Sequence, residues 1–424
     1  MCVRRSRYLG SAVVAAAPGY PDIASALVRN DYDEVIRGVR EAVTADGVAA
    51  LSDAVIQEWL GRRYRNIFLT ECGDDASALR AAKVPMPIQL IDRRSSRELV
   101  AARFLKGVNR QESQALLPDA KEPKLNGSTL LFVPGLMTGL LPVMAFQSVW
   151  GRIEKRFGVR ILGAEVHPVR SCADNTADIK LAIEKGRGFD ADSQHIPAKE
   201  AKKPKDVVML GYDKGAADAL TFLVDNPNLR SRVKAFVGWA GIFGGSYIAD
   251  DIYSRLDANP STSSPLSGPI GKMLRQIVPV VQADRVTTRL EQYDVNAAIG
   301  DITTGVRTQY LADHVDEINE MGIPTFTVEG VTSLREVPYY QAMGVLQLNS
   351  YDKNNDMLIT VGQARLPVAH STRLASFRGH HWDLAYDPFP WFTRMGSLNV
   401  DHKFARYPAM AALLILLAEI GLMN

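Results

Sequence analysis

The stretch that decides the fold runs from residue 207 to residue 220 and reads VVMLGYDKGAADAL. Its first four residues form an apolar run typical of a buried strand, and its end has the composition of a helix. Between them Gly211 and Gly215 flank Asp213. Glycines at these places allow a turn so tight that the central residue is strained and its side chain is pushed out over the sheet. The alternative interpretation is that Asp213 simply caps the helix.

Similar alternation of strand and helix continues on both sides of this motif. Six apolar runs have the character of strands: Thr129–Val133, Val159–Val166, Asp206–Leu210, Val233–Trp239, Thr325–Val328 and Thr372–Phe377. Short apolar runs that alternate with helical segments are typical of parallel strands joined by crossover helices. The sequence therefore predicts an α/β fold with a doubly wound, mostly parallel sheet across residues 124–424.

The first 120 residues have a different texture. Their apolar side chains recur at helical spacing, which predicts a mostly helical N-terminal extension. A strand-like stretch, residues 87–91, interrupts it, and a Pro- and Lys-containing linker around residues 117–127 marks the domain boundary.

A long connection follows the fourth predicted strand. Residues 241–322 greatly exceed the usual few residues of such a connection. Helical periodicity at residues 270–280 and 308–321 predicts a helical cap over the carboxyl edge of the sheet, where ligands bind in open α/β folds. The polar, Lys-rich residues 186–205 are expected to form a loop.

Composition narrows the class of protein. The chain has 424 residues, of which 46% are hydrophobic and 23% charged, and a formal net charge of +2. These values are typical of a soluble globular protein and favour no nucleic-acid partner. Its three cysteines form no CxxC pair, and no G-x-G-x-x-G follows the first strand. We therefore expect neither a metal nor a cofactor. The oligomeric state is left open.

The two ends of the chain bear on location. Arg4, Arg5 and Arg7 precede a short apolar run, Leu9 to Ala17, which faintly resembles a secretory signal. A cytoplasmic location is favoured, with export as the alternative. The apolar run from Pro408 to Met423 is shorter than the ~20 residues needed to cross a bilayer. It is expected to be a buried last helix, so no membrane span is predicted.

The elbow motif and its neighbours resemble the α/β-hydrolase superfamily, specifically lipase- and esterase-like bacterial members with a G-[HY]-S-K-G elbow. The resemblance spans residues 124–424 and includes residues 211–215 (GYDKG), 239–246 (WAGIFGGS) and the stretch from Asn355 to Trp382. It implies an oxyanion hole formed by backbone N–H groups of Lys214 and of either Leu136 or Met137.

The resemblance also implies a triad in the order nucleophile, acid, histidine. The acid is expected beyond the penultimate strand, where Asp356 is favoured and Asp352 and Glu329 remain alternatives. The base is expected just beyond the last strand, where His381 is favoured over His380. His402 and His370 are further candidates.

This sequence differs from the family pattern at Asp213, because the lipase- and esterase-like members carry Ser at this position. Three interpretations follow. The favoured one is a hydrolase of esterase lineage acting on an ester or related acyl substrate, small or lipid-like and apolar. The second is an Asp-nucleophile hydrolase of the haloalkane dehalogenase or epoxide hydrolase type, although those enzymes usually carry Trp where Lys214 stands. The third is a catalytically silent binding protein.

Overall fold

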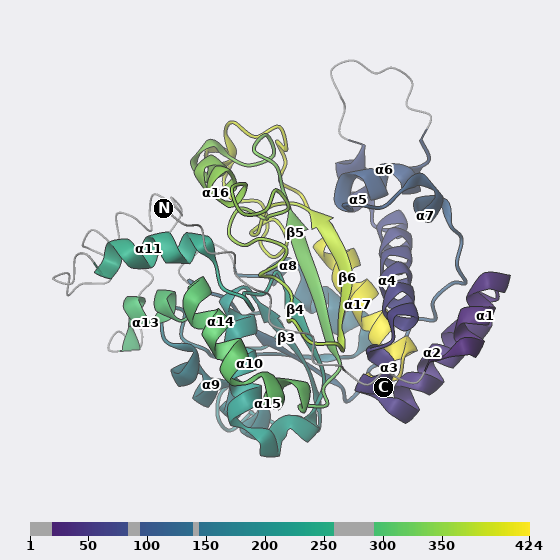
Figure 1. Cartoon of the computed structure of the whole chain (residues 1–424), viewed down its shortest axis with the longest axis horizontal. Helices are drawn as coiled ribbons and strands as arrows, with labels where there is room; N and C mark the ends of the chain where they lie inside the picture. Colours follow the sequence, from purple (N-terminus) through teal and green to yellow (C-terminus); the bar gives the residue numbers. More distant parts are fainter. Residues whose placement is uncertain (1–18, 84–93, 139–143, 258–291) are drawn as a thin grey trace, which may run out of the picture.

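A six-stranded parallel sheet forms the centre of the computed structural model, which describes residues 19–83, 94–138, 144–257 and 292–424 (Figure 1). The strand order is β2-β1-β3-β4-β5-β6, and every neighbouring pair is parallel. The strands are β1 (Thr129–Val133), β2 (Arg160–Gly163), β3 (Val207–Tyr212), β4 (Val233–Trp239), β5 (Thr325–Val331) and β6 (Ser371–Arg378). The predicted doubly wound, mostly parallel sheet is confirmed.

Side chains that alternate along β1, β2, β3 and β4 enter two separate cores, whereas the core side chains of β5 and β6 lie in the first core. In β1, Leu130 and Phe132 belong to the first core, whereas Leu131 and Val133 belong to the second. This follows from the two-residue period of a strand. Burial of both faces explains why β1 and β3 are nearly continuous apolar runs rather than alternating ones.

Helices cover both faces of the sheet. Side chains of α8 (Gln147–Phe157) and α17 (Arg406–Glu419) line the first core, and those of α9 (Cys172–Lys185) and α10 (Lys214–Asp225) line the second. The other elements of this part are α11 (Tyr247–Asp257), α13 (Val295–Gly300), α14 (Thr304–Asp313), α15 (Val315–Asn319), α16 (Ala342–Leu348) and the short helices η1 (Pro227–Arg232), η4 (Tyr339–Gln341) and η5 (Trp391–Arg394).

The N-terminal extension is helical in its described part and shares the first core. Its helices are α1 (Pro21–Arg29), α2 (Tyr32–Asp46), α3 (Val48–Leu51), α4 (Ala54–Asp74), α5 (Ala76–Ala82), α6 (Ser96–Phe104) and α7 (Arg110–Gln114). Helix α4 runs beside α17 and β6 (Figure 1). The expected strand at residues 87–91 and the signal-like residues 1–18 lie outside the described residues.

A buried ion pair joins the extension to the last helix. The Arg63 guanidinium donates to both carboxylate oxygens of Glu419, with N–O distances of 2.8 and 2.6 Å. It also donates to the Pro118 carbonyl. Since Arg63 is only 1% exposed, this charge depends on Glu419 for compensation.

The long connection between β4 and β5 is helical where it is described. Its C-terminal part packs on the sheet, because Ile318 and Met321 join the second core with side chains of α10. Residues 258–291, which include the helix expected at 270–280, lie outside the described residues. The predicted cap over the carboxyl edge of the sheet, formed by residues 241–322, therefore remains a proposal.

The apolar C-terminal run forms α17, as expected. Eleven of its fourteen residues are buried, so its apolar character is explained by packing in the core. Among the described helices, none combines the length and apolarity required to span a bilayer.

We expect Arg63→Met to lower the free energy of unfolding by about 3 kcal/mol, because it leaves the Glu419 carboxylate unpaired in a mostly buried position. Urea unfolding followed by circular dichroism measures this loss. Arg37→Met is the control, since Arg37 is exposed and lies 4.0 Å from Glu34. Equal stability of the two variants would show that the extension does not depend on this ion pair.

Candidate active site

Asp213 is the single residue between the end of β3 and the start of α10, and its backbone conformation is one that L-residues rarely adopt. Its φ is 55° and its ψ is −130°. Two glycines make this turn sterically feasible. A Cβ on Gly211 would lie 2.6 Å from the Ala216 Cα, and one on Gly215 would collide with the Val133 carbonyl of the neighbouring strand β1. The elbow thus has the predicted strand, strained turn and helix.

The loop that follows β1 lies against the Asp213 side chain. The Leu136 N–H donates to Asp213 Oδ2 over 2.8 Å, and a Cβ on Gly135 would meet the Asp213 Cβ at 2.5 Å. Met137 has its N–H directed elsewhere, to the Pro168 carbonyl at 3.0 Å. Of the two loop donors considered from the sequence, the geometry favours Leu136. Lys214 is the first residue of α10, where backbone N–H groups lack partners within the helix.

His381 lies between Asp213 and Asp356. Its Nδ1 is 2.7 Å from Asp356 Oδ2, within hydrogen-bonding distance. Its Nε2 is 3.3 Å from Asp213 Oδ1, an ion-pair contact that lacks the alignment of a hydrogen bond. The other oxygen of Asp356 accepts the N–H groups of Leu358 and Ile359 at 3.0 and 2.9 Å. Asp356 is therefore fixed on one side by the backbone and contacts the imidazole on the other.

The two carboxylates dominate the electrostatics of His381. Burial alone would lower the pKa of this imidazole, but Asp356 and Asp213 together raise it to about 10. Tyr212 packs its ring 5.1 Å from the imidazole, centre to centre, and donates its hydroxyl to the His381 carbonyl. The imidazolium is thus the charge that compensates two buried carboxylates.

The alternative acids have other partners. Glu329 is fully buried on β5, where Arg365 donates two hydrogen bonds of 2.9 and 3.0 Å to its carboxylate. Asp352 lies in a turn and accepts the N–H of Asn354. Neither contacts His381 in the described structure.

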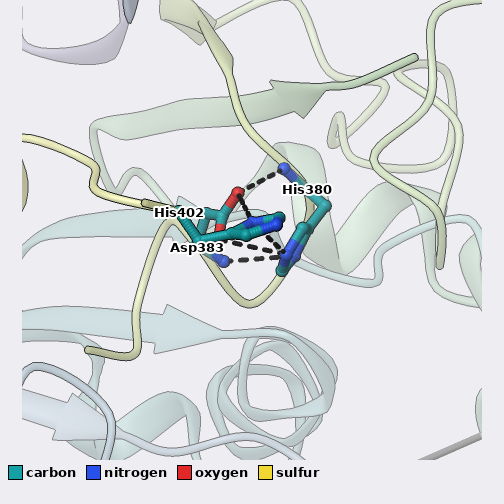
Figure 2. Close-up of side chains that lie close together, drawn as sticks. All are labelled: His380, Asp383 and His402. Carbon is teal, nitrogen blue, oxygen red and sulfur yellow. Dashed lines mark hydrogen bonds and ion pairs between the residues drawn. The ribbon is translucent and has the colours of Figure 1, made fainter. Parts of the chain in front are cut away.

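The alternative histidines are also placed away from Asp213. His380 and His402 contact Asp383, with ring nitrogen to carboxylate distances of 3.0 Å in each case (Figure 2). His370 is buried just before β6, and its Nε2 has no hydrogen-bond partner. Asp383 was not considered from the sequence. Its only signal there was its spacing, three residues after His380.

A second feature that the sequence did not suggest is the buried side chain of Lys214. Its ammonium group lies 2.5 Å from Asp218 Oδ1, and Asn175 donates to Asp218 Oδ2 at 2.9 Å. Burial alone would lower the pKa of Lys214, but the Asp218 carboxylate raises it above its ordinary value. A Lys and an Asp four residues apart are usually read as a solvated helix pair, which hides their burial here.

With this geometry in place, comparison with solved structures is informative about the fold. The chain superposes on the metagenomic carboxyl esterase MGS0156 with a TM-score of 0.59 and 18% identity, over 84% of this chain and 91% of that one. The chain has the α/β-hydrolase fold. Neither a family model nor a curated protein sequence matches it.

Two further structural matches to α/β hydrolases are weaker. The mature Bacillus licheniformis lipase BlEst2 matches with a TM-score of 0.41 and 18% identity, over 62% of this chain and 89% of that one. Lipase 1 from Pelosinus fermentans matches with a TM-score of 0.42 and 12% identity, over 68% of this chain and 98% of that one.

We expect Lys214→Met to lower the free energy of unfolding by about 3 to 5 kcal/mol, because the buried Asp218 carboxylate loses its counter-charge. The double variant Lys214→Met/Asp218→Leu should recover most of this loss, since it removes the unpaired charge. Urea unfolding of parent, single and double variants measures both effects. A single variant as stable as a typical surface substitution, within about 0.5 kcal/mol of the parent, would contradict the ion pair.

Proposed function

We propose that the chain is a hydrolase of ester or related acyl substrates in which Asp213 is the nucleophile, His381 the proton-transfer group and Asp356 the acid that orients it. Backbone N–H groups of Leu136 and Lys214 would form the oxyanion hole. The site proposed is that of an esterase with an Asp carboxylate in place of the Ser hydroxyl. The carboxylate is already ionised and needs no base for its attack.

One observation carries this proposal: the two oxygens of Asp213 have different surroundings. Oδ2 accepts the Leu136 N–H at 2.8 Å, and Oδ1 faces His381 Nε2 at 3.3 Å. A nucleophilic carboxylate requires this division, since one oxygen must attack while the other becomes the carbonyl oxygen of the intermediate. The Leu136 N–H would then stabilise negative charge on Oδ2 when that intermediate is hydrolysed.

The reaction balances with these groups alone. Asp213 Oδ1 attacks the acyl carbon of the ester, and the alcohol leaves with a proton from the His381 imidazolium. The neutral imidazole then takes a proton from water, whose oxygen attacks the Asp213 Cγ of the mixed anhydride. The acid product leaves and Asp213 is restored, so one ester and one water give one acid and one alcohol.

We further propose that an apolar substrate contacts the surface around η4, α16 and η5. Several large apolar side chains are well exposed there, namely Tyr339, Met343, Leu346, Trp391, Phe392, Met395 and Leu398. The two segments are joined, because the Tyr339 N–H donates to the Met395 carbonyl. Exposed apolar side chains gathered in this way favour contact with an apolar ligand over a solvated surface.

A second candidate is attack of the same carboxylate on a saturated carbon, as in haloalkane dehalogenases and epoxide hydrolases. The division of the Asp213 oxygens favours it equally, because an alkyl-enzyme ester would place its carbonyl oxygen near the Leu136 N–H. The difference lies in the leaving group. His381, whose Nε2 lies 3.3 Å from Asp213 Oδ1, is a proton donor at this position, which suits an epoxide or ester oxygen better than a halide.

We expect Asp213→Asn to abolish turnover of p-nitrophenyl esters by the parent, with kcat falling at least about 1,000-fold, because the amide keeps the shape of the side chain but is not a nucleophile. Steady-state kinetics on a panel of esters, epoxides and haloalkanes measures the loss. Asp352→Asn is the matched control, since Asp352 lies in an exposed turn away from His381. Equal loss in both variants would remove the nucleophile role from Asp213.

Asp213→Ser distinguishes the candidates further. An esterase constellation should accept the Ser, because His381, Asp356 and the N–H donors are already placed, and each such donor contributes about 3 kcal/mol to the transition state. Ester turnover should then persist or rise, while any epoxide or haloalkane turnover of the parent should vanish. If neither parent nor Ser variant acts on any member of the panel, the hydrolase proposal is wrong and the binding-protein interpretation is favoured.

A further inference from the structure

We propose that His380, Asp383 and His402 bind a divalent transition metal of the zinc class at a buried structural site. The proposal is independent of the hydrolase proposal, since none of the three residues contacts Asp213. It departs from the sequence-based expectation of no metal site. Figure 2 shows the three side chains pointing toward one another from two loops.

The three candidate ligand atoms form a nearly equilateral triangle. His380 Nε2 and His402 Nδ1 are 3.1 Å apart, and each is 3.0 Å from Asp383 Oδ1. Around a tetrahedral zinc with bonds of about 2.0 to 2.1 Å, neighbouring ligand atoms are about 3.3 Å apart. A small outward movement of each side chain would therefore place all three atoms at coordination distance from one ion.

Hydrogen bonds cannot satisfy this triangle. The carboxylate oxygen carries no proton, and each of the two facing nitrogens carries at most one. Both imidazole protons can point at Asp383, but the 3.1 Å contact between the nitrogens then joins two N–H groups. A cation at the centre of the triangle would interact favourably with all three atoms at once.

Metal binding requires the facing nitrogen of each imidazole to give up its proton to the other ring nitrogen. In His402 the proton would move from Nδ1 to Nε2, which is buried and has no hydrogen-bond partner. At present the Asp383 N–H donates to His380 Nδ1 over a long 3.3 Å, which places the ring proton on Nε2. Coordination by Nε2 would move this proton to Nδ1 and open that contact. The second Asp383 oxygen, which at present also lies 3.2 Å from His402 Nδ1, would keep the His380 N–H and the Asn399 amide nitrogen, both at 3.4 Å.

The donor set indicates the class of metal. Two imidazole nitrogens and one carboxylate oxygen suit zinc, cobalt or nickel, whereas calcium and magnesium prefer oxygen donors alone. All three residues are at most 4% exposed, so a structural role is favoured over contact with substrate. An ion there would tie the loop that carries His381 to the segment before α17, where His402 has a strained φ of 45°.

The test measures metal content, not activity. The full-length protein is treated with a chelator to remove metal, dialysed and titrated with Zn²⁺ and with Co²⁺. Bound metal is then quantified by elemental mass spectrometry. We expect one equivalent per chain and a cobalt absorption spectrum typical of tetrahedral coordination. Asp383→Asn and His402→Ala should each weaken zinc binding at least about 100-fold. Loss of a group that only orients a ligand weakens binding by up to about 100-fold, and loss of a ligand itself should cost at least as much. His370→Ala is the control, because His370 is buried but outside the triangle.

A further variant keeps the test decisive if loss of a ligand prevents folding. His402→Cys retains a zinc ligand, so it should bind cobalt and show a thiolate-to-cobalt charge-transfer band that the parent lacks. No bound metal in the parent would overturn the proposal and leave the three residues as a hydrogen-bonded cluster only. Cobalt bound by the Cys variant without this band, or binding unchanged in the Asn and Ala variants, would place the metal elsewhere and also overturn it.

Discussion

The close approach of β3 and α10 around Asp213 is the constraint on which the geometry of the site depends. The backbone of Asp213 is held at a positive φ, which costs about 1 to 3 kcal/mol and persists only where the surroundings enforce it. Here they do, because β3 lies inside the sheet between β1 and β4, and α10 is buried along its length. The strain fixes where the Asp213 carboxylate points, and with it the contacts to Leu136 and His381.

The loop after β6 is the second determinant, because it carries His381 and is held from three sides. The Phe146 N–H donates to the Ala385 carbonyl, the Trp239 indole to the Leu384 carbonyl and Arg406 to the Asp383 carbonyl. These bonds come from the residue before α8, from β4 and from α17. Donors and proton-transfer groups act best when they are placed before the reaction begins, and such a loop meets that requirement.

Much of the fold could be predicted because its signals are local. Strands buried on both faces appear as short apolar runs, and the glycines of the elbow mark the sharpest turn. The positions of Asp356 and His381 were predicted from chain order and from their place beyond particular strands. Their roles in catalysis remain a proposal.

Contacts between distant parts of the chain could not be predicted in the same way. Arg63 and Glu419 are separated by 356 residues, and nothing in either local pattern shows that they meet. The Lys214 and Asp218 pair looks like a surface pair until the burial of α10 is known. His402 joins His380 and Asp383 only because the segment before α17 folds back over the His381 loop.

Single-turnover hydrolysis of an ester in heavy-oxygen water, followed by mass spectrometry of the peptide that contains Asp213, tests the central claim most directly. The account predicts one heavy oxygen in the Asp213 carboxylate and none in the first acid product, because the Leu136 N–H favours water attack at the Asp213 Cγ. Heavy oxygen found only in the acid product would contradict it, since water would then have attacked the substrate itself.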